Sequence, residues 1–312
     1  MIGIAKGPLL TKWCKMRRVT SFFYIIKKEE FTLSTLKRVT LGDALYDVKR
    51  PWPNQEKSRI FSEISHLSLA PTGEVYILQR QEPIIIVFSY EGERIKKWKH
   101  PLLDGGHALH IAEDDRVFLA DWDDHILLIF DSNGELLQVI GDSMRPRFGQ
   151  PFNHPTDVAV APNGDLFITD GYGNSCVHHF DAQGNHIKTW GEPGEGPGQF
   201  STPHALCFDK EGRILVTDRE NNRVQIFNQE GHYIGQIGHL YHPMDIAVDT
   251  EGFIYVTDQT PRLSKFSPEG KLIGRCRTMG TYAHGLDVDP EGNIYLAEML
   301  PSNVTKLIKV EE

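Results

Sequence analysis

The sequence predicts an all-β protein, a six-bladed β-propeller of repeated units whose ring is closed by an N-terminal strand. The main observation is a sequence motif in which a turn residue precedes a run of β-branched, aromatic and aliphatic residues. The motif occurs six times, and its copies start at Gly73, Asp115, Gly164, Gly212, Gly252 and Gly292. A short apolar segment precedes each copy, and another follows it. Antiparallel four-stranded units that recur every ~40–50 residues are typical of propeller blades, which bury their faces by stacking around an axis.

Each blade is expected to run from its innermost to its outermost strand in chain order. The innermost strand is short and apolar, as in residues 157–161, and the second strand follows the turn residue. The third strand ends at a large apolar residue, namely Phe88, Phe130, Phe180, Phe227, Phe266 or Leu307. In five copies a second glycine turn leads to a fourth strand, at Gly92, Gly134, Gly184, Gly231 and Gly270. Such turns are typical of antiparallel hairpins.

The sixth copy ends near the C-terminus after only three strands, so its outermost strand must come from elsewhere. The extended segment Tyr46 to Trp52 precedes the first blade and is the expected donor, since prolines are tolerated on an edge strand. Residues 41–312 are thus predicted to form the propeller. Residues 1–40, rich in Lys and Arg, are predicted to be a poorly ordered basic extension. The alternative is a basic arm that touches an acidic partner or a membrane surface.

Composition excludes several classes of protein. With 312 residues, 40% of them hydrophobic, the chain is an ordinary globular protein with a sizeable core. Its formal net charge of −9 disfavours nucleic-acid binding. No apolar run approaches the roughly 18–20 residues of a membrane-spanning helix, and we expect no secretory signal. The four cysteines are far apart and form no CxxC pair, which favours a reducing, cytoplasmic setting. We expect a monomer.

The alignment of the copies predicts a metal site. The residue eight positions before the turn residue opens each innermost strand, and in order these are Ser65, His107, Thr156, His204, Met244 and His284. Histidine therefore occurs only in alternate blades, about 120° apart in a six-fold ring. Three imidazoles that converge on the axis, with one open position, are what a catalytic Zn²⁺ favours. The alternative for any one of them is a histidine that fills a polar channel and binds water.

A second register adds candidate catalytic groups. Seven residues after the turn residue, just past the second strand, the chain has Arg80 in blade 1 and Arg219 in blade 4, and Tyr172 lies one position further in blade 3. In an antiparallel hairpin this position adjoins the start of the first strand, so these residues should face the same mouth as the histidines. Arginine suits a carboxylate, and a tyrosine beside cations and a metal can act as a base. Alternatively, these residues only form solvated turn pairs or pack a loop. Histidines outside the first register, such as His178 and His242, are expected at the surface or in turns.

The motifs resemble known families. The phrase Val-Thr-Asp-x-x-x-x-Arg-Val-Gln-Ile-Phe at 216–227 resembles the NHL repeat. The stretch 152–227, with Asp-Gly-Tyr-Gly-Asn and Ser-Thr-Pro-His-Ala-Leu, is similar to peptidyl-α-hydroxyglycine α-amidating lyases. The resemblance implies a zinc ion held by His107, His204 and His284, with Tyr172, Arg80 and Arg219 as active-site residues. The implied reaction cleaves a small carbinolamide, an N-acyl-α-hydroxyglycine, into an amide and glyoxylate.

The sequence also departs from that family. Its structural calcium uses an aspartate directly after the third zinc histidine, where this chain has Gly285, so calcium is in doubt here. Its secreted members have a cysteine where this chain has Gly173, which fits an intracellular variant. The loop around Arg80 matches only in part, and nothing in the chain resembles the monooxygenase that peptide amidation also needs.

Two other functions stay open from the sequence. The same histidine tripod could serve a zinc-dependent hydrolase or a ureidoglycolate-type lyase. Alternatively, the propeller is a non-catalytic NHL-type scaffold that binds a ligand or a protein. Bound metal and the products formed would separate these possibilities.

Overall fold

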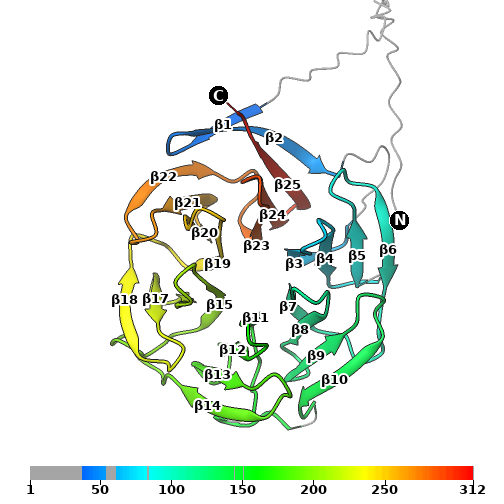
Figure 1. Ribbon diagram of the computed structural model, residues 1–312, viewed down its shortest axis with the longest axis vertical. Coiled ribbons are helices and arrows are strands. Elements are labelled where there is room, and N and C mark those ends of the chain that lie inside the picture. The colour runs from blue at the N-terminus through cyan, green and yellow to red at the C-terminus, as the bar shows by residue number, and fades with distance from the viewer. Residues whose placement is uncertain (1–36, 54–60, 83, 144, 150, 312) are drawn as a thin grey trace, which may run out of the picture. The chain divides into compact units, whose positions relative to one another are not determined.

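The computed structural model describes residues 37–53, 61–82, 84–143, 145–149 and 151–311. All regular elements in these residues are β-strands, arranged as six small antiparallel sheets around a common axis (Figure 1). The predicted six-bladed β-propeller is therefore confirmed. Accordingly, this part of the chain contains no helix long and apolar enough to cross a membrane.

Blades 1 to 5 each contain four strands that follow one another in the sheet as they do in the sequence. Blade 1 contains β3 (Ile64–Leu69), β4 (Val75–Gln79), β5 (Ile85–Phe88) and β6 (Arg94–Trp98). Blade 2 contains β7 (Gly106–Ile111), β8 (Val117–Asp121), β9 (Ile126–Phe130) and β10 (Leu136–Gly141). Blade 3 contains β11 (Asp157–Val160), β12 (Leu166–Asp170), β13 (Cys176–Phe180) and β14 (His186–Trp190). Blade 4 contains β15 (Pro203–Phe208), β16 (Ile214–Asp218), β17 (Arg223–Phe227) and β18 (Tyr233–Ile237). Blade 5 contains β19 (Pro243–Val248), β20 (Ile254–Asp258), β21 (Arg262–Phe266) and β22 (Leu272–Arg277).

Blade 6 closes the ring with strands from both ends of the described chain. It contains β23 (Ala283–Val288), β24 (Ile294–Met299), β25 (Ser302–Lys309), β2 (Ala44–Trp52) and β1 (Lys37–Leu41). The antiparallel pairing of β2 with β25 runs from Tyr46 opposite Lys309 to Trp52 opposite Val304, as the sequence predicts. The fifth strand, β1, was not predicted, and it includes residues 37–40 of the expected extension. The rest of that prediction, for residues 1–36, lies outside the described residues.

The turn residues that define the repeat share one backbone conformation. The five glycines of the motif have φ between 72° and 92°, a region that strongly favours glycine. In blade 2 the same turn is made by Asp115, with φ of 63°, and aspartate is one of the few other residues that tolerate this region. The sequence motif therefore occurs six times because each copy forms the same tight turn.

The core lies between neighbouring blades. The second and third strands are almost completely buried, whereas the fourth strands of blades 1 to 5 are partly exposed. One apolar cluster, for example, joins Leu78 and Ile85 of blade 1 to Leu119 and Leu128 of blade 2. Because each sheet buries its faces only against its neighbours, closure of the ring stabilises every blade. This rigid frame fixes the inner strands, which carry the candidate site.

Candidate metal centre

Three buried histidines converge on the axis. His107, His204 and His284 lie near the start of the inner strands β7, β15 and β23, which belong to alternate blades. Their ring centroids are 4.8 to 4.9 Å apart in all three pairs. One ring nitrogen of each lies within 4.8 Å of those of the other two. The structure therefore brings together the three residues that the register singled out.

The other nitrogen of each ring is bonded to the next blade. The Nδ1 atoms of His107, His204 and His284 lie 2.6, 2.7 and 2.8 Å from backbone carbonyl oxygens. The carbonyls belong to Thr156, Met244 and Ser65, the residues that occupy the same register in the three blades without histidine. A carbonyl oxygen can only accept, so each Nδ1 carries the proton and each Nε2 keeps its lone pair. Such a bond fixes both the orientation of a ligating imidazole and its tautomer.

The surroundings keep the three imidazoles neutral. Burial lowers the pKa of His107 and of His204 well below the usual value, and it lowers the pKa of His284 to about 3. Nearby positive groups, among them Arg80 for His107 and His284 and Arg219 for His204 and His284, act in the same direction. Three neutral, oriented nitrogens with one open side suit a zinc ion, so the residues present fit this metal.

Tyr172 places its hydroxyl group against the tripod. It follows β12, and its Oη atom lies 3.0 Å from Nε2 of His107 and 3.2 Å from Nε2 of His204. Burial raises the pKa of the phenol, although the Arg219 and Arg80 charges oppose this shift. The protein's own groups therefore do not lower this pKa, in contrast to the effect expected from neighbouring cations alone.

Two glycines make the Tyr172 loop possible. A Cβ atom on Gly171 would lie 2.0 Å from the carbonyl oxygen of Pro203, and one on Gly173 would lie 2.3 Å from that of Asn153. Neither backbone position can therefore carry a side chain without a shift of the loop. The Gly-Tyr-Gly sequence thus has a steric cause: it lets the loop between β12 and β13 approach the neighbouring backbone segments.

The two predicted arginines lie at the same mouth of the ring. Arg219 follows β16, donates from Nη1 to the Tyr172 hydroxyl over 3.3 Å, and holds its Cζ atom 5.3 Å from the centre of the Tyr172 ring. Arg80 follows β4, and its Cζ atom is 5.9 Å from the centre of the Trp122 ring. The Nε atom of Arg80 lies 3.6 Å from the Glu63 carboxylate but, within the described residues, has no hydrogen-bond partner. Arg80 is thus less firmly engaged than Arg219.

The aromatic wall of this mouth was missed from the sequence. Trp122 follows β8 and contacts the ring of Tyr172, with centroids 5.6 Å apart, as well as the ring of His154 at 5.9 Å. Its position is seven residues after the turn residue Asp115, the register that gave Arg80 and Arg219. The register therefore marks this position too, but an aromatic side chain by itself does not indicate a site.

A buried ion pair occupies the channel next to the tripod. His66, Asp157 and Asp245 directly follow the register residues of blades 1, 3 and 5, and all three are buried. Nε2 of His66 lies 3.1 Å from the Asp245 carboxylate, as an ion contact rather than a well-directed hydrogen bond. Burial opposes protonation, yet the Asp245 charge outweighs it and raises the pKa of His66 to about 9.

The calcium ligand of the resembling family, an aspartate directly after the third zinc histidine, is replaced by Gly285. A Cβ atom at Gly285 would also lie only 3.0 Å from the His66 backbone, so an aspartate in this position would be tightly confined. The residues present therefore do not fit the calcium site of the resembling family.

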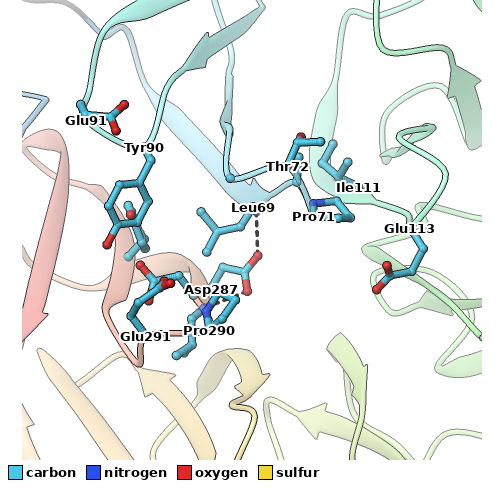
Figure 2. A pocket seen from close by; sticks show the side chains of 15 residues that line it. Leu69, Pro71, Thr72, Tyr90, Glu91, Ile111, Glu113, Asp287, Pro290 and Glu291 are labelled. Atoms are coloured by element: carbon cyan, nitrogen blue, oxygen red, sulfur yellow. Dashed lines mark hydrogen bonds between the residues drawn. The ribbon is translucent and has the colours of Figure 1, made fainter.

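A cavity of about 520 Å³ lies at the opposite end of the inner strands, among blades 1, 2 and 6 (Figure 2). Its lining includes the carboxylates of Glu91, Glu113, Asp287 and Glu291. Asp287 accepts a hydrogen bond of 2.8 Å from the Leu69 backbone, as Figure 2 shows. None of the six predicted site residues lines this cavity, and its charge disfavours an anionic ligand.

Comparisons with known proteins identify the repeat. The family model of the NHL repeat matches residues 152–180 and 200–227. The chain contains NHL repeats. The two matched segments include the first three strands of blade 3 and of blade 4. Tyr172, His204 and Arg219 all lie within these segments.

Named relatives match between about half and three quarters of the chain. NHL repeat-containing protein 3 of Homo sapiens is 29% identical over 269 residues, which are 76% of each protein. Peptidyl-alpha-hydroxyglycine alpha-amidating lyase 1 of Drosophila melanogaster is 27% identical over 272 residues, 73% of this chain and 49% of the relative. The probable lyase of this name from Caenorhabditis elegans is 35% identical over 150 residues, 46% of this chain and 43% of the relative. The chain thus matches about half the length of these lyases.

Solved structures share the fold of these NHL repeats. Streptogramin B lyase superimposes with a TM-score of 0.64 at 13% identity, over 85% of this chain and 98% of the other. A putative gluconolactonase superimposes with the same TM-score at 18% identity, over 86% and 94%. At such identities the likeness establishes the propeller fold alone.

One of the NHL repeats contains a second group of possible ligands. In blade 3, a carboxylate oxygen of Asp170, Sγ of Cys176 and a ring nitrogen of His178 all lie within 4.8 Å of one another. These atoms already bond within the blade, since His178 contacts Asp170 at 3.1 Å through Nε2 and Thr189 at 2.7 Å through Nδ1. The expectation that His178 lies at the surface or in a turn is wrong, because the residue is buried in β13.

The neighbouring repeat explains this group. In blade 4, Arg223 and Gln225 donate to Asp218 over 2.8 and 3.0 Å, from the positions that Cys176 and His178 occupy in blade 3. The buried group in blade 3 is thus the local version of a link that holds the second and third strands together.

Proposed function

We propose that this protein is a zinc-dependent carbon-nitrogen lyase that cleaves an N-acyl-α-hydroxyglycine into an amide and glyoxylate. The observation that carries the proposal is the contact of the Tyr172 hydroxyl with Nε2 of two tripod histidines, beside an arginine. The similarity to proteins named alpha-amidating lyases supports the same reaction class. A zinc ion held by His107, His204 and His284 would act as a Lewis acid on the carbinol hydroxyl of the substrate.

Tyr172 is the candidate for proton transfer. Its Oη atom lies at the open side of the tripod, where it could accept the carbinol proton. The O–H electrons then form the carbonyl group of glyoxylate, and the electrons of the breaking C–N bond remain on nitrogen. Return of the proton from Oη to that nitrogen completes the amide and restores Tyr172. Arg219 donates to Oη and opposes the effect of burial, and the charge of a zinc ion held beside Oη would further favour the phenolate that accepts the proton.

Arg80 is the candidate for binding the substrate carboxylate. Both Nε and Nη1 of Arg219 are already bonded, to Glu220 and to Tyr172. Arg80 lies over the Trp122 ring, and its Nε atom is 3.6 Å from Glu63 but makes no hydrogen bond within the described residues, so its guanidinium can pair with a substrate anion. A planar guanidinium suits a carboxylate because it donates two parallel hydrogen bonds.

We also propose a reducing compartment, because the four cysteines of the sequence are far apart and form no CxxC pair. Cys176, Cys207 and Cys276 form no disulfide with one another. Burial raises the pKa of each thiol, which keeps it protonated and unreactive.

The test incubates zinc-loaded protein with an N-acyl-α-hydroxyglycine and measures the release of glyoxylate. The second product is then identified as either the free amide or the free acid. Glyoxylate with free amide supports the proposal. Free acid indicates a hydrolase, and urea released from ureidoglycolate indicates the related lyase. Protein that neither binds zinc nor turns over any of these compounds would refute the proposal and favour a binding scaffold.

A further inference from the structure

We propose that Glu220 is a positioning residue that fixes the Arg219 guanidinium against Tyr172, with His242 as a second anchor for its carboxylate. Glu220 is exposed and directly follows Arg219 in the loop after β16. This inference rests on the proposed function, in which Arg219 acts on the hydroxyl group of Tyr172.

The Glu220 carboxylate uses its two oxygens for two different partners. Arg219 donates from Nε to Oε1 over 2.9 Å, and Nδ1 of His242 lies 3.2 Å from Oε2. Through Nη1, the same guanidinium donates to Tyr172 over 3.3 Å. With its Nε side engaged by Glu220, the planar group keeps its Nη1 side toward the tripod mouth. The pair thus sets the direction in which Arg219 donates.

The backbone holds both ends of this arrangement. The N–H groups of Arg219 and Glu220 donate to the carbonyls of Thr202 and Ser201 over 3.1 and 3.0 Å. On the other side, the His242 N–H donates to Oδ1 of Asn222 over 2.8 Å. The carboxylate therefore bridges the loops of blades 4 and 5, while Arg219 reaches toward blade 3.

Without Glu220, nothing else in the described residues holds the Nε side of Arg219. A long arginine side chain has many rotamers, and the one that points into solvent becomes accessible when the pair is lost. Small misplacements of a group that acts on the reacting atoms lower turnover strongly. We expect Glu220→Gln to reduce kcat roughly 10- to 100-fold. KM should change less, since Arg80 binds the carboxylate in the proposed function.

The chain offers a matched control in the same blade. Glu211 pairs with Arg213 over 3.3 Å in the turn between β15 and β16, at the other end of the blade. Glu211→Gln removes an exposed Arg–Glu pair without touching the mouth, so kcat should stay within about twofold of wild type. In an Arg219→Ala background, Glu220→Gln should have no further effect on kcat, because the residue acts only through Arg219.

A measurement that does not depend on turnover tests the Glu220–Arg219 contact itself. In protein labelled with ¹⁵N-arginine, the Nε–H signal of Arg219, assigned by its loss in Arg219→Lys, should exchange slowly with solvent. Glu220→Gln should abolish this protection, whereas Glu211→Gln should leave it intact. Unchanged protection or unchanged kcat in Glu220→Gln would overturn the inference. Wild-type protein that releases no glyoxylate would instead refute the proposed function. The NMR result would show separately whether Glu220 holds the Arg219 guanidinium.

Discussion

Replacement of Tyr172 by phenylalanine tests the proposed proton transfer. The change removes only Oη, the atom that contacts Nε2 of His107 and His204 and accepts from Arg219. The ring contacts remain, since they depend on the aromatic ring and not on the hydroxyl. Loss of a general base lowers turnover by about 10²- to 10⁴-fold. The loss of a partly exposed hydroxyl should change the free energy of unfolding by about 1 kcal/mol at most.

The assay measures glyoxylate release under saturating substrate, with zinc content and urea unfolding of the same samples. Zinc should remain at the wild-type level, because the three imidazoles and their Nδ1 bonds are intact. Tyr241→Phe is the control, since this exposed tyrosine of the neighbouring loop also loses a hydroxyl but lies outside the tripod. A Tyr172→Phe protein with wild-type kcat would refute the assigned role.

Three further predictions concern the frame of the site. Gly171→Ala places a Cβ atom 2.0 Å from the Pro203 carbonyl and should destabilise the protein by about 2–4 kcal/mol in urea unfolding. Gly235→Ala, with no atom within 4 Å of the new carbon, should be nearly neutral, and equal effects would contradict the steric argument. Trp52→Ala empties a fully buried position at the ring closure and should lower the free energy of unfolding by about 3–5 kcal/mol. A negligible change would contradict the role of this strand in closing the ring. The pKa of His66 is raised to about 9 in the folded state, so its ion pair should stabilise the protein fully below pH 6.5 and lose this contribution as pH rises through 9. His66→Gln should flatten that decline, and an unchanged pH profile would contradict the ion pair.

The sequence was sufficient for the fold and for the positions of the tripod. Each turn needs a residue that tolerates positive φ, and the copies can be aligned on it. That alignment places His107, His204 and His284 in equivalent positions of alternate blades, which the structure brings together on the axis. The closing strand was also predictable, because the last blade lacked a strand and one extended segment was left over.

The groups that support the tripod were not predictable in the same way. The carbonyls that orient the histidines belong to the backbone of Ser65, Thr156 and Met244, and every residue type has such a carbonyl. The Glu220–His242 contact joins loops from two blades, and the sequence does not show which loop side chains meet across a gap. A repeat alignment finds equivalent positions, whereas these contacts depend on how one blade is rotated against the next.

The most direct test of the central claim is the zinc content of purified protein by elemental analysis. We expect one zinc per chain, lost in each of His107→Ala, His204→Ala and His284→Ala. The exposed His232 lies outside the tripod, and His232→Ala should retain the metal. Protein without zinc, or zinc that survives all three substitutions, would contradict the metal centre on which the proposed lyase activity depends.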